Sequence, residues 1–538
     1  MNRVFKTRWS VARQQYVVTD EEHASKGKAS KSVVALAVAA AAALTAGAAS
    51  AAYVEPGFVA QSAYDVEKAT ASWETAEYLD DWGLKALNAS SAYALGYNGS
   101  GIAVGVMDSG ALLYKHPDLN GDRFHAVTVD NQHYGSSGNR YPQHTTDDGV
   151  YTPDSEVPVS GEWQMGMNDS HGTHVTGTVG GNRDGNVFHG VAWGADIYVG
   201  NTGGTDDTNY GPFQDPQFFY QGWNAIAKEL SKKNTFSDGT TRGGFINNSF
   251  GTNTRVVDNG SYGPDGGSTK VHFPTDTVSQ TEYEYFLFMK DAQNRKNTDS
   301  RWDNKSFVDA AYEAVKDEKV VQIFTTGNRD FANPFYRPLY PYFNPEAEQN
   351  WIAVSGLTKD GDDKYKLWGT VNEAGNAKWW TVVAPGTNIS SSIVNGDGTP
   401  GYSNTYSGTS MAAPHVAGVM AVLMDRYDQM DALQVRDVML TTSTHYNPDG
   451  SIMTGWTNTD GTTPKDGEVS DRMGWGLPDL KKGMYGPGQL LGTFTYNMRD
   501  ADSIDVWSND ISEVALNQRE AEDKAWKAAA DARRQVQG

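Results

Sequence analysis

The fold is decided by one stretch, Tyr406-Ser407-Gly408-Thr409-Ser410-Met411-Ala412-Ala413-Pro414-His415-Val416-Ala417-Gly418. A glycine and small hydroxyl residues lead into small apolar residues, which predicts a tight turn that opens a closely packed helix. Ser410 then lies at the helix N-terminus, where unpaired N–H groups and the helix dipole favour negative charge. A hydroxyl there suits acyl transfer, because an oxyanion would form beside these donors. A buried helix with a serine cap explains the same residues equally well.

A second stretch places an acid at the end of a strand. Ile102-Ala103-Val104-Gly105-Val106-Met107 is a short apolar run, which predicts a strand buried on both faces of a parallel sheet. It ends at Asp108-Ser109-Gly110, so Asp108 would point into the crevice where α/β folds bind ligands. An aspartate before glycine is also common in plain turns, and that alternative stays open.

A third stretch places a base at the start of a helix. Asp169-Ser170-His171-Gly172-Thr173-His174-Val175-Thr176-Gly177-Thr178-Val179-Gly180-Gly181 has small residues at helical spacing, which predicts close packing against another element. An imidazole at position 171 could take a proton from a hydroxyl while an acid orients its other nitrogen. His171 and His174 could instead bind a metal, although no third ligand is near in sequence.

Together the three stretches resemble the aspartate, histidine and serine motifs of subtilisin-like serine proteases (peptidase family S8). These motifs read D-[ST]-G, H-G-T-H-V-x-G and G-T-S-M-A-x-P-H-V-A-G. The acid precedes the base by 63 residues and the base precedes the serine by 239, which is the subtilisin order. The resemblance implies an α/β fold of three layers, with a mostly parallel central sheet flanked by helices. It also implies Asp108, His171 and Ser410 as catalytic residues and His174 as a structural one.

The same resemblance supplies the remaining site residues. Thr325-Thr326-Gly327-Asn328 resembles the A-G-N motif and implies that Asn328 and the Ser410 amide form the oxyanion hole. Phe245-Ile246-Asn247-Asn248-Ser249-Phe250-Gly251 resembles the strand that pairs with substrate, and it implies Ser249, Phe250 and Gly251 as substrate-binding residues. Further strands are expected at 320–324, 350–356 and 382–386, and helices at 223–230 and 307–315. A long insertion follows at 252–303 and is expected to overhang the substrate site.

Composition limits the classes of partner. The 538 residues carry a formal net charge of −22, which argues against nucleic acid because no basic surface is expected. The chain has no cysteine, which excludes a disulfide scaffold and a thiol nucleophile. No cofactor is needed for the expected chemistry, and we expect a monomer that acts on proteins or peptides. A structural Ca²⁺ ion is possible at Asp184, together with Asp118, although a solvated turn explains Asp184 as well.

Four segments are expected along the chain. Residues 1–51 form an extended signal peptide, with Lys26, Lys28 and Lys31 before a short apolar run that ends in small residues. This leader resembles that of Gram-negative type V secreted proteins (autotransporters), so we expect a secreted or cell-surface protein with no transmembrane span after the signal peptide is removed. Residues 52–94 form an N-terminal arm and 95–485 the catalytic domain. Residues 486–538 form a linker and helical tail that would lead to an autotransporter barrel, which the chain itself does not encode.

Two other expectations complete the interpretation. Residues 122–166 show little periodicity and are expected to form an extended surface loop, on which His125, His133 and His144 are plain surface histidines. The function expected is a secreted serine endopeptidase that acts through an acyl-enzyme. The alternative is a surface adhesin that keeps a protease fold without activity. An α/β-hydrolase esterase is opposed by the order of acid and base.

Overall fold

The computed structural model describes residues 5–10, 15–20, 57–61, 63–134, 155–203, 216–250, 257–258, 270–271, 299–486, 495–497 and 504–506. The chain divides into two units, Met1–Pro56 and Gly57–Gly538. In the first unit, β1 (Phe5–Ser10) pairs antiparallel with β2 (Gln15–Asp20). The apolar run of the leader, most of the 252–303 insertion and the expected helical tail lie outside the described residues.

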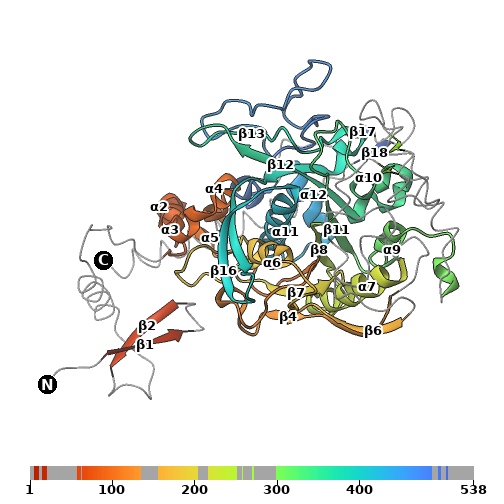
Figure 1. Ribbon diagram of the computed structural model, residues 1–538. Coiled ribbons are helices and arrows are strands. Elements are labelled where there is room, and N and C mark those ends of the chain that lie inside the picture. Colours follow the sequence, from red (N-terminus) through yellow and green to blue (C-terminus); the bar gives the residue numbers. More distant parts are fainter. Residues whose placement is uncertain are drawn as a thin grey trace. The chain divides into compact units, whose positions relative to one another are not determined.

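The second unit is built on a sheet of eight strands (Figure 1). Its order is β13-β12-β11-β8-β3-β7-β4, and β14 pairs with β12. All pairings are parallel except that of β12 with β13. The strands are β3 (Ala103–Asp108), β4 (Phe124–Ala126), β7 (Asp196–Asn201), β8 (Gly244–Asn248), β11 (Val320–Thr325), β12 (Trp351–Lys359), β13 (Tyr365–Leu367) and β14 (Thr381–Pro385).

Helices cover both faces of this sheet, because each central strand is apolar on both sides. On β3, Val104 and Val106 join one hydrophobic cluster, whereas Ala103 and Met107 join the other. The first face carries α6 (His171–Gly180), α11 (Thr409–Arg426) and α12 (Ala432–Thr442). The second carries α7 (Pro216–Lys233), α9 (Phe307–Glu313) and α10 (Tyr336–Phe343). The three-layer α/β prediction is therefore confirmed.

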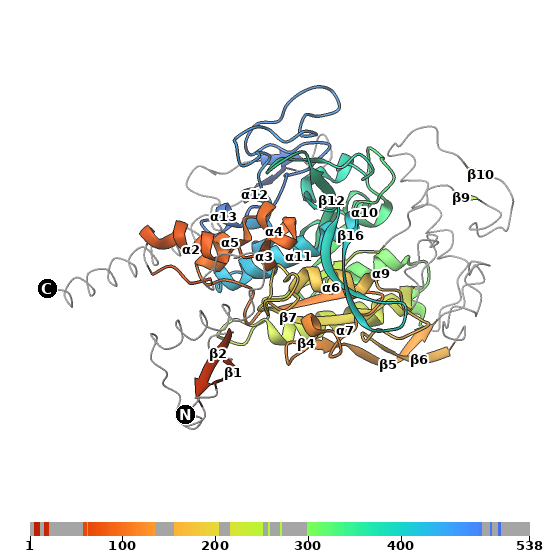
Figure 2. The same ribbon diagram turned by 60° about the vertical axis from the view of Figure 1, so that its left-hand side comes forward.

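The N-terminal arm packs on the first face (Figure 2). Its helices are α2 (Val66–Trp73), α3 (Ala76–Asp80), α4 (Trp82–Ala86) and α5 (Ala89–Ala94), and α13 (Leu480–Gly483) contacts α5. Trp82 donates its indole N–H to the carbonyl of Thr387, and Tyr93 donates its hydroxyl to the carbonyl of Val191. The arm is thus joined to the rest of the unit by buried polar contacts as well as apolar ones.

The prediction of a featureless loop over 122–166 is wrong in the described part. Strand β4 extends the central sheet, and β5 (Thr128–Tyr134) pairs antiparallel with β6 (Ser155–Ser160). The hairpin packs on α7, where the buried Gln132 donates to the carbonyl of Phe218. Polar residues on both strands hid the alternation that normally reveals a hairpin.

The second unit also contains two-stranded antiparallel sheets that are separate from the central sheet. They are β15 (Ile389–Val394) with β16 (Pro400–Tyr406), β9 (Val257–Asp258) with β10 (Lys270–Val271), and β17 (Thr495–Asn497) with β18 (Ile504–Val506). The β15–β16 pair leads directly into α11. Among the described residues, no helix has both the length and the apolar character to cross a membrane.

Candidate active site

The acid and the base lie in direct contact. Asp108 is the last residue of β3 and is fully buried, whereas His171 begins α6 and its side chain is 26% exposed. His171 Nδ1 lies 2.7 Å from Asp108 Oδ1. A carboxylate can only accept, so the neutral ring carries its proton on Nδ1 and its lone pair on Nε2. This is the tautomer that a general base requires.

Ser109 and Asp169 hold this pair, and sequence reasoning missed both. Asp169 Oδ1 accepts from the His171 N–H and from the Ser109 hydroxyl, each at 2.8 Å. Ser109 Oγ accepts from the N–H of Gly172 at 2.8 Å, and the Ser109 N–H donates to Asp108 Oδ1 at 2.8 Å. The end of β3 and the start of α6 are thereby joined in one ring of hydrogen bonds. An aspartate just before a helix is a capping signal that could have revealed this role.

Gly172 allows α6 to approach the loop after β3 at backbone distance. A Cβ added to Gly172 would lie 2.3 Å from the carbonyl oxygen of Gly110 and 3.0 Å from the nitrogen of Ser109. Gly110 itself has a φ of +75°, a conformation that favours glycine. The two glycines therefore set the distance between the helix that carries the base and the strand that carries the acid.

Ser410 lies in the first turn of α11 and is tied to Ser249, just beyond β8. Ser410 Oγ donates to the Ser249 carbonyl at 2.8 Å, and Ser249 Oγ donates to the Ser410 carbonyl at 2.9 Å. The second bond is possible because Pro414, four residues on, has no N–H for that carbonyl. Pro414 thus lies inside α11 at a position where its missing N–H leaves the Ser410 carbonyl available to an outside donor. The expected approach of Ser410 Oγ to His171 Nε2 stays a prediction.

Asn328 and the Ser410 amide flank one small volume. Asn328 Oδ1 accepts from the N–H of Thr409 at 2.9 Å and from its hydroxyl at 3.0 Å, so the orientation of the amide group is set. An ideal Cβ placed on Gly408 would lie 3.4 Å from Asn328 Nδ2 and 3.6 Å from the Ser410 nitrogen. Two N–H donors thus border the space beside a glycine, which is the arrangement that can hold an oxyanion.

Comparison with known families agrees with this geometry. Residues 99–476 match the subtilase family of peptidases, which covers well over half of the chain. This chain belongs to the subtilase family. Residues 1–50 match the extended signal peptide of the type V secretion system, so the predicted secretion signal is confirmed and the subtilase is a secreted or cell-surface protein.

Individual relatives cover most of this subtilase. An extracellular serine protease of Serratia marcescens is 28% identical over 471 residues, covering 82% of this chain and 36% of that protein. The autotransporter lipoprotein NalP of Neisseria meningitidis serogroup B is 23% identical over 453 residues, covering 79% and 37%. The crystal structure of fervidolysin from Fervidobacterium pennivorans aligns at 22% identity with a TM-score of 0.43, covering 82% and 52%. The chain therefore spans little more than a third of the curated relatives it matches.

Two of the three expected substrate-binding residues, Ser249 and Phe250, are described by the structure, and their side chains make different contacts. Ser249 is buried and bonded to Ser410. The ring of Phe250 is 4% exposed and packs against Phe219 and Trp223 of α7, with ring centroids 5.6 and 6.4 Å away. Only the main chain of Phe250 is therefore available to a substrate. Gly251 lies outside the described residues.

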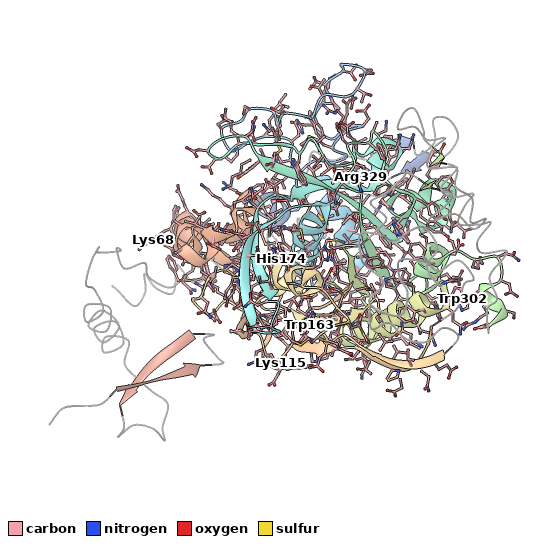
Figure 3. The ribbon with its side chains drawn as sticks, in the orientation of Figure 1. Lys68, Lys115, Trp163, His174, Trp302 and Arg329 are labelled. Carbon is pink, nitrogen blue, oxygen red and sulfur yellow. The ribbon has the colours of Figure 1, made fainter. Side chains whose placement is uncertain are left out.

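His174 lies on α6, one turn after His171, and its side chain is fully buried (Figure 3). Its Nε2 lies 3.0 Å from the carbonyl of Ile389, and its ring stacks on Tyr406 at 4.5 Å. Burial lowers the pKa of His174 to about 3, so the ring is neutral at physiological pH. These contacts attach α6 to the β15–β16 pair and are consistent with the structural role expected for this residue.

Of the three histidines expected on the 122–166 loop, the structure describes the side chain of His125. His125 stacks on Tyr198 at 4.4 Å, and its Nε2 lies 3.6 Å from Asp196. The side chains of His133 and His144 lie outside the described part. Across the residues that the structure describes, no three histidine or acidic side chains form a group that could hold a metal ion.

The two expected calcium ligands already have hydrogen-bond donors. Asp184 accepts from the backbone and side-chain N–H groups of Asn186, at 3.0 and 2.7 Å. Asp118 accepts from the hydroxyls of Ser392 and Tyr402, both at 3.3 Å. Burial, with a smaller contribution from the charge of Asp184, raises the pKa of Asp118 to about 7. As placed, these carboxylates do not fit a shared calcium site, so we derive no step through a metal.

Proposed function

We propose that this subtilase is a secreted serine endopeptidase that hydrolyses peptide bonds through an Asp108–His171–Ser410 triad. Ser410 Oγ attacks the scissile carbonyl carbon while His171 Nε2 takes the hydroxyl proton. The tetrahedral intermediate places its oxyanion between Asn328 Nδ2 and the Ser410 N–H. His171 then gives the proton to the leaving amine, which leaves Ser410 acylated. Water, deprotonated by the same imidazole, hydrolyses the acyl-enzyme.

The observation that carries this proposal is the 2.7 Å contact between Asp108 and His171. A buried carboxylate that bonds Nδ1 leaves Nε2 as the acceptor and stabilises the imidazolium that forms during proton transfer. The Ser410 hydroxyl bonds the Ser249 carbonyl in the structure. A rotation about the Cα–Cβ bond of Ser410 would redirect Oγ, and catalytic hydrogen bonds often tighten only when substrate is bound.

Labelling with a fluorophosphonate tests the proposal directly, because the reagent phosphonylates only an activated serine, with fluoride as the leaving group. The full chain should be labelled at Ser410, and Ser410→Ala should abolish both labelling and peptide hydrolysis. Loss of the serine in a triad of this kind lowers turnover by roughly a million-fold. Ser403→Ala, a serine on the neighbouring strand β16, is the matched control and should be labelled normally. An unlabelled parent protein would favour the alternative, an adhesin on a protease fold.

Substrates are proposed to be proteins or peptides, and the residue preferred at the cleavage site can be measured by profiling a peptide library. The proposed chemistry uses protein groups alone. Calcium, expected from the sequence only as a structural ion, is tested by thermal unfolding with and without a chelator. Equal midpoints in the two conditions would contradict a stabilising ion at Asp184.

A further inference from the structure

The nucleophile helix is attached to strand β8 at its first turn. Ser249 follows β8 directly, and it exchanges two hydrogen bonds with Ser410 through the hydroxyl of each and the carbonyl of the other. Helix α11 also packs along β8 in the first hydrophobic layer. The N-terminal end of the helix therefore meets the carboxyl end of the strand.

The far end of α11 is attached to the beginning of the same strand by Arg242. This arginine precedes β8 by two residues and is only 6% exposed. Its Nη2 donates to the carbonyls of Met424 and Tyr427 at 2.8 and 2.7 Å, and its Nε donates to that of Met430 at 2.9 Å. Carbonyls in the last turn of a helix have no partner within it, and a cation there also complements the helix dipole.

The backbone of Arg242 is itself held by hydrogen bonds, which restricts where its guanidinium group can lie. Its N–H donates to the carbonyl of Asn234 at the end of α7, and its carbonyl accepts from the N–H of Ala432 at the start of α12. Asp425, Asp428 and Asp431 provide neighbouring negative charge. Arg242 is thereby bonded to three helices and continues directly into β8.

The spacing of the two attachments matches. From Arg242 to Ser249 the chain passes along the whole of β8 and advances seven residues, which span at most about 23 Å. From Ser410 to Met424 the helix advances fourteen residues, about 21 Å along its axis. Helix and strand run in opposite directions over comparable lengths, so a shift of α11 along its axis would break hydrogen bonds at both ends.

We infer that Arg242 is a positioning residue that fixes α11 along β8 and so holds Ser410 at the oxyanion site. This inference rests on the proposed role of Ser410. Between its ends, α11 meets its neighbours mainly through small and apolar side chains, and hydrophobic contact is not directional. The polar contact in this middle part is that of His415 with Asp81 of the N-terminal arm. Gly408, at its N-cap, makes no side-chain capping bond. Hydrogen bonds at the two ends, together with the His415–Asp81 contact, therefore define the axial position of the helix.

Helix α6, which carries the base, has the same kind of attachment. Arg123 donates from Nη2 to the carbonyl of Gly180, the last residue of α6, at 2.5 Å, and from Nη1 to that of Ala195 at 2.8 Å. Its Nε and Nη2 also bond the side-chain oxygen of Asn182, at 3.1 and 2.6 Å. Both helices of the proposed triad thus end on a largely buried arginine from a distant part of the chain.

The test compares Arg242→Lys with Arg436→Lys. Arg436 is equally buried, bonds the carbonyl of Trp351 and the carboxylate of Glu348, and lies on α12 rather than at the end of α11. Both variants should lose stability. At a temperature where both are folded, Arg242→Lys should lower kcat and the fluorophosphonate labelling rate at least tenfold with KM unchanged, whereas Arg436→Lys should keep the parental kcat. Equal kcat in the two variants would overturn the inference.

A double-mutant cycle gives a second readout that a general loss of stability would not move. Arg242 and Ser249 lie beyond opposite ends of β8, and independent sites more than about 10 Å apart have multiplicative effects on rate within about twofold. If Arg242 and Ser249 both set the position of α11, the loss of kcat in Arg242→Lys/Ser249→Ala should differ from the product of the two single-variant losses by more than about twofold. A multiplicative result would count against the inference. Failure of the parent protein to label would instead refute the proposed function, so the two failures are distinguishable.

Discussion

Replacement of Gly408 by alanine should remove activity while leaving the fold intact. The new methyl carbon would lie 3.4 Å from Asn328 Nδ2, 3.6 Å from the Ser410 nitrogen and 3.8 Å from Asn328 Oδ1. These are ordinary van der Waals distances, so no backbone atom has to move. Removing a glycine also lowers the conformational entropy of the unfolded chain, which stabilises by about 0.4–1 kcal/mol where the backbone permits alanine.

The effect on catalysis should be much larger. An oxyanion has to lie about 2.7–3.1 Å from both donors, and the methyl group would occupy the space between them. Loss of one such donor costs a factor of about 10²–10³, so obstruction of both should lower kcat/KM by at least about 10³. That factor corresponds to about 4 kcal/mol of transition-state stabilisation.

Three measurements separate catalysis from folding. The fluorophosphonate labelling rate and kcat/KM on a peptide report the reaction, and affinity for a peptide boronic acid reports binding of a transition-state analogue. Thermal unfolding reports the fold. Gly369→Ala is the matched control, because a Cβ at this exposed glycine would meet nothing within 4 Å.

The expected pattern is a loss of rate and of boronic acid affinity in Gly408→Ala, with an unfolding midpoint at or above that of the parent. Gly369→Ala should match the parent in every assay. If Gly408→Ala labels at the parental rate, the oxyanion does not form beside Gly408, and the assignment of Asn328 fails with it. A variant that unfolds would contradict the steric argument instead.

Three further predictions concern Gly172, Asp108 and His189. Gly172→Ala should lower kcat/KM about a hundredfold, because its Cβ would lie 2.3 Å from the Gly110 carbonyl oxygen and must displace the helix that carries the base by nearly an ångström. Asp108→Asn should reduce kcat by less than roughly ten-thousandfold, which is the loss seen where an asparagine imposes the wrong histidine tautomer. The Ser109 N–H donates to Oδ1 of residue 108, the oxygen that contacts His171 Nδ1, and so opposes a flip of the asparagine amide. The loss of kcat is measured from pH-rate profiles of the variant and the parent. The free energy of unfolding should fall as the pH is lowered from about 6 to 4. Burial lowers the pKa of His189 to about 3, so in this range the unfolded chain binds a proton at His189 that the folded chain does not. In denaturant titrations, His189→Phe should reduce the slope of the free energy of unfolding against pH by about 1 kcal/mol per pH unit.

Much of the sheet could be predicted because its strands are uniform in character. The apolar run at 102–107 is buried on both faces as β3, and Asp108 ends it. Runs at 320–324 and 382–386 became β11 and β14 for the same reason. The β5–β6 hairpin was not predicted, because its strands are polar and separated by twenty residues. Neither an alternating hydrophobic pattern nor a short turn therefore indicated it.

The residues proposed to react were predictable, whereas those that hold them were not. Asp108, His171 and Ser410 stand in local patterns that predict a strand end or a helix start. Arg242 and Arg123 donate to carbonyls at the ends of helices that are far away in sequence. No local sequence pattern identifies a side chain that caps a distant helix. Such contacts are long-range in sequence and depend on the packed arrangement itself.

The stretch around Ser410 contains many residues that are not proposed to react, and their contacts explain why the motif is long. Pro414 leaves the Ser410 carbonyl free to accept from Ser249. His415 is fully buried and bonds through Nε2 to Asp81 of the N-terminal arm at 2.9 Å, and through Nδ1 to the carbonyl of Met411 at 2.7 Å.

Glycines complete the packing of this stretch against two other parts of the chain. A Cβ at Gly418 would lie 2.5 Å from the Cβ of Val191, and one at Gly83 of the arm would lie 2.2 Å from the ring of His415. Most of these residues never approach the reacting atoms. They define how α11 packs against the arm, the loop after α6 and strand β8. The length of the motif reflects this packing, and the proposed reaction of Ser410 depends on neighbours that hold the helix in one position.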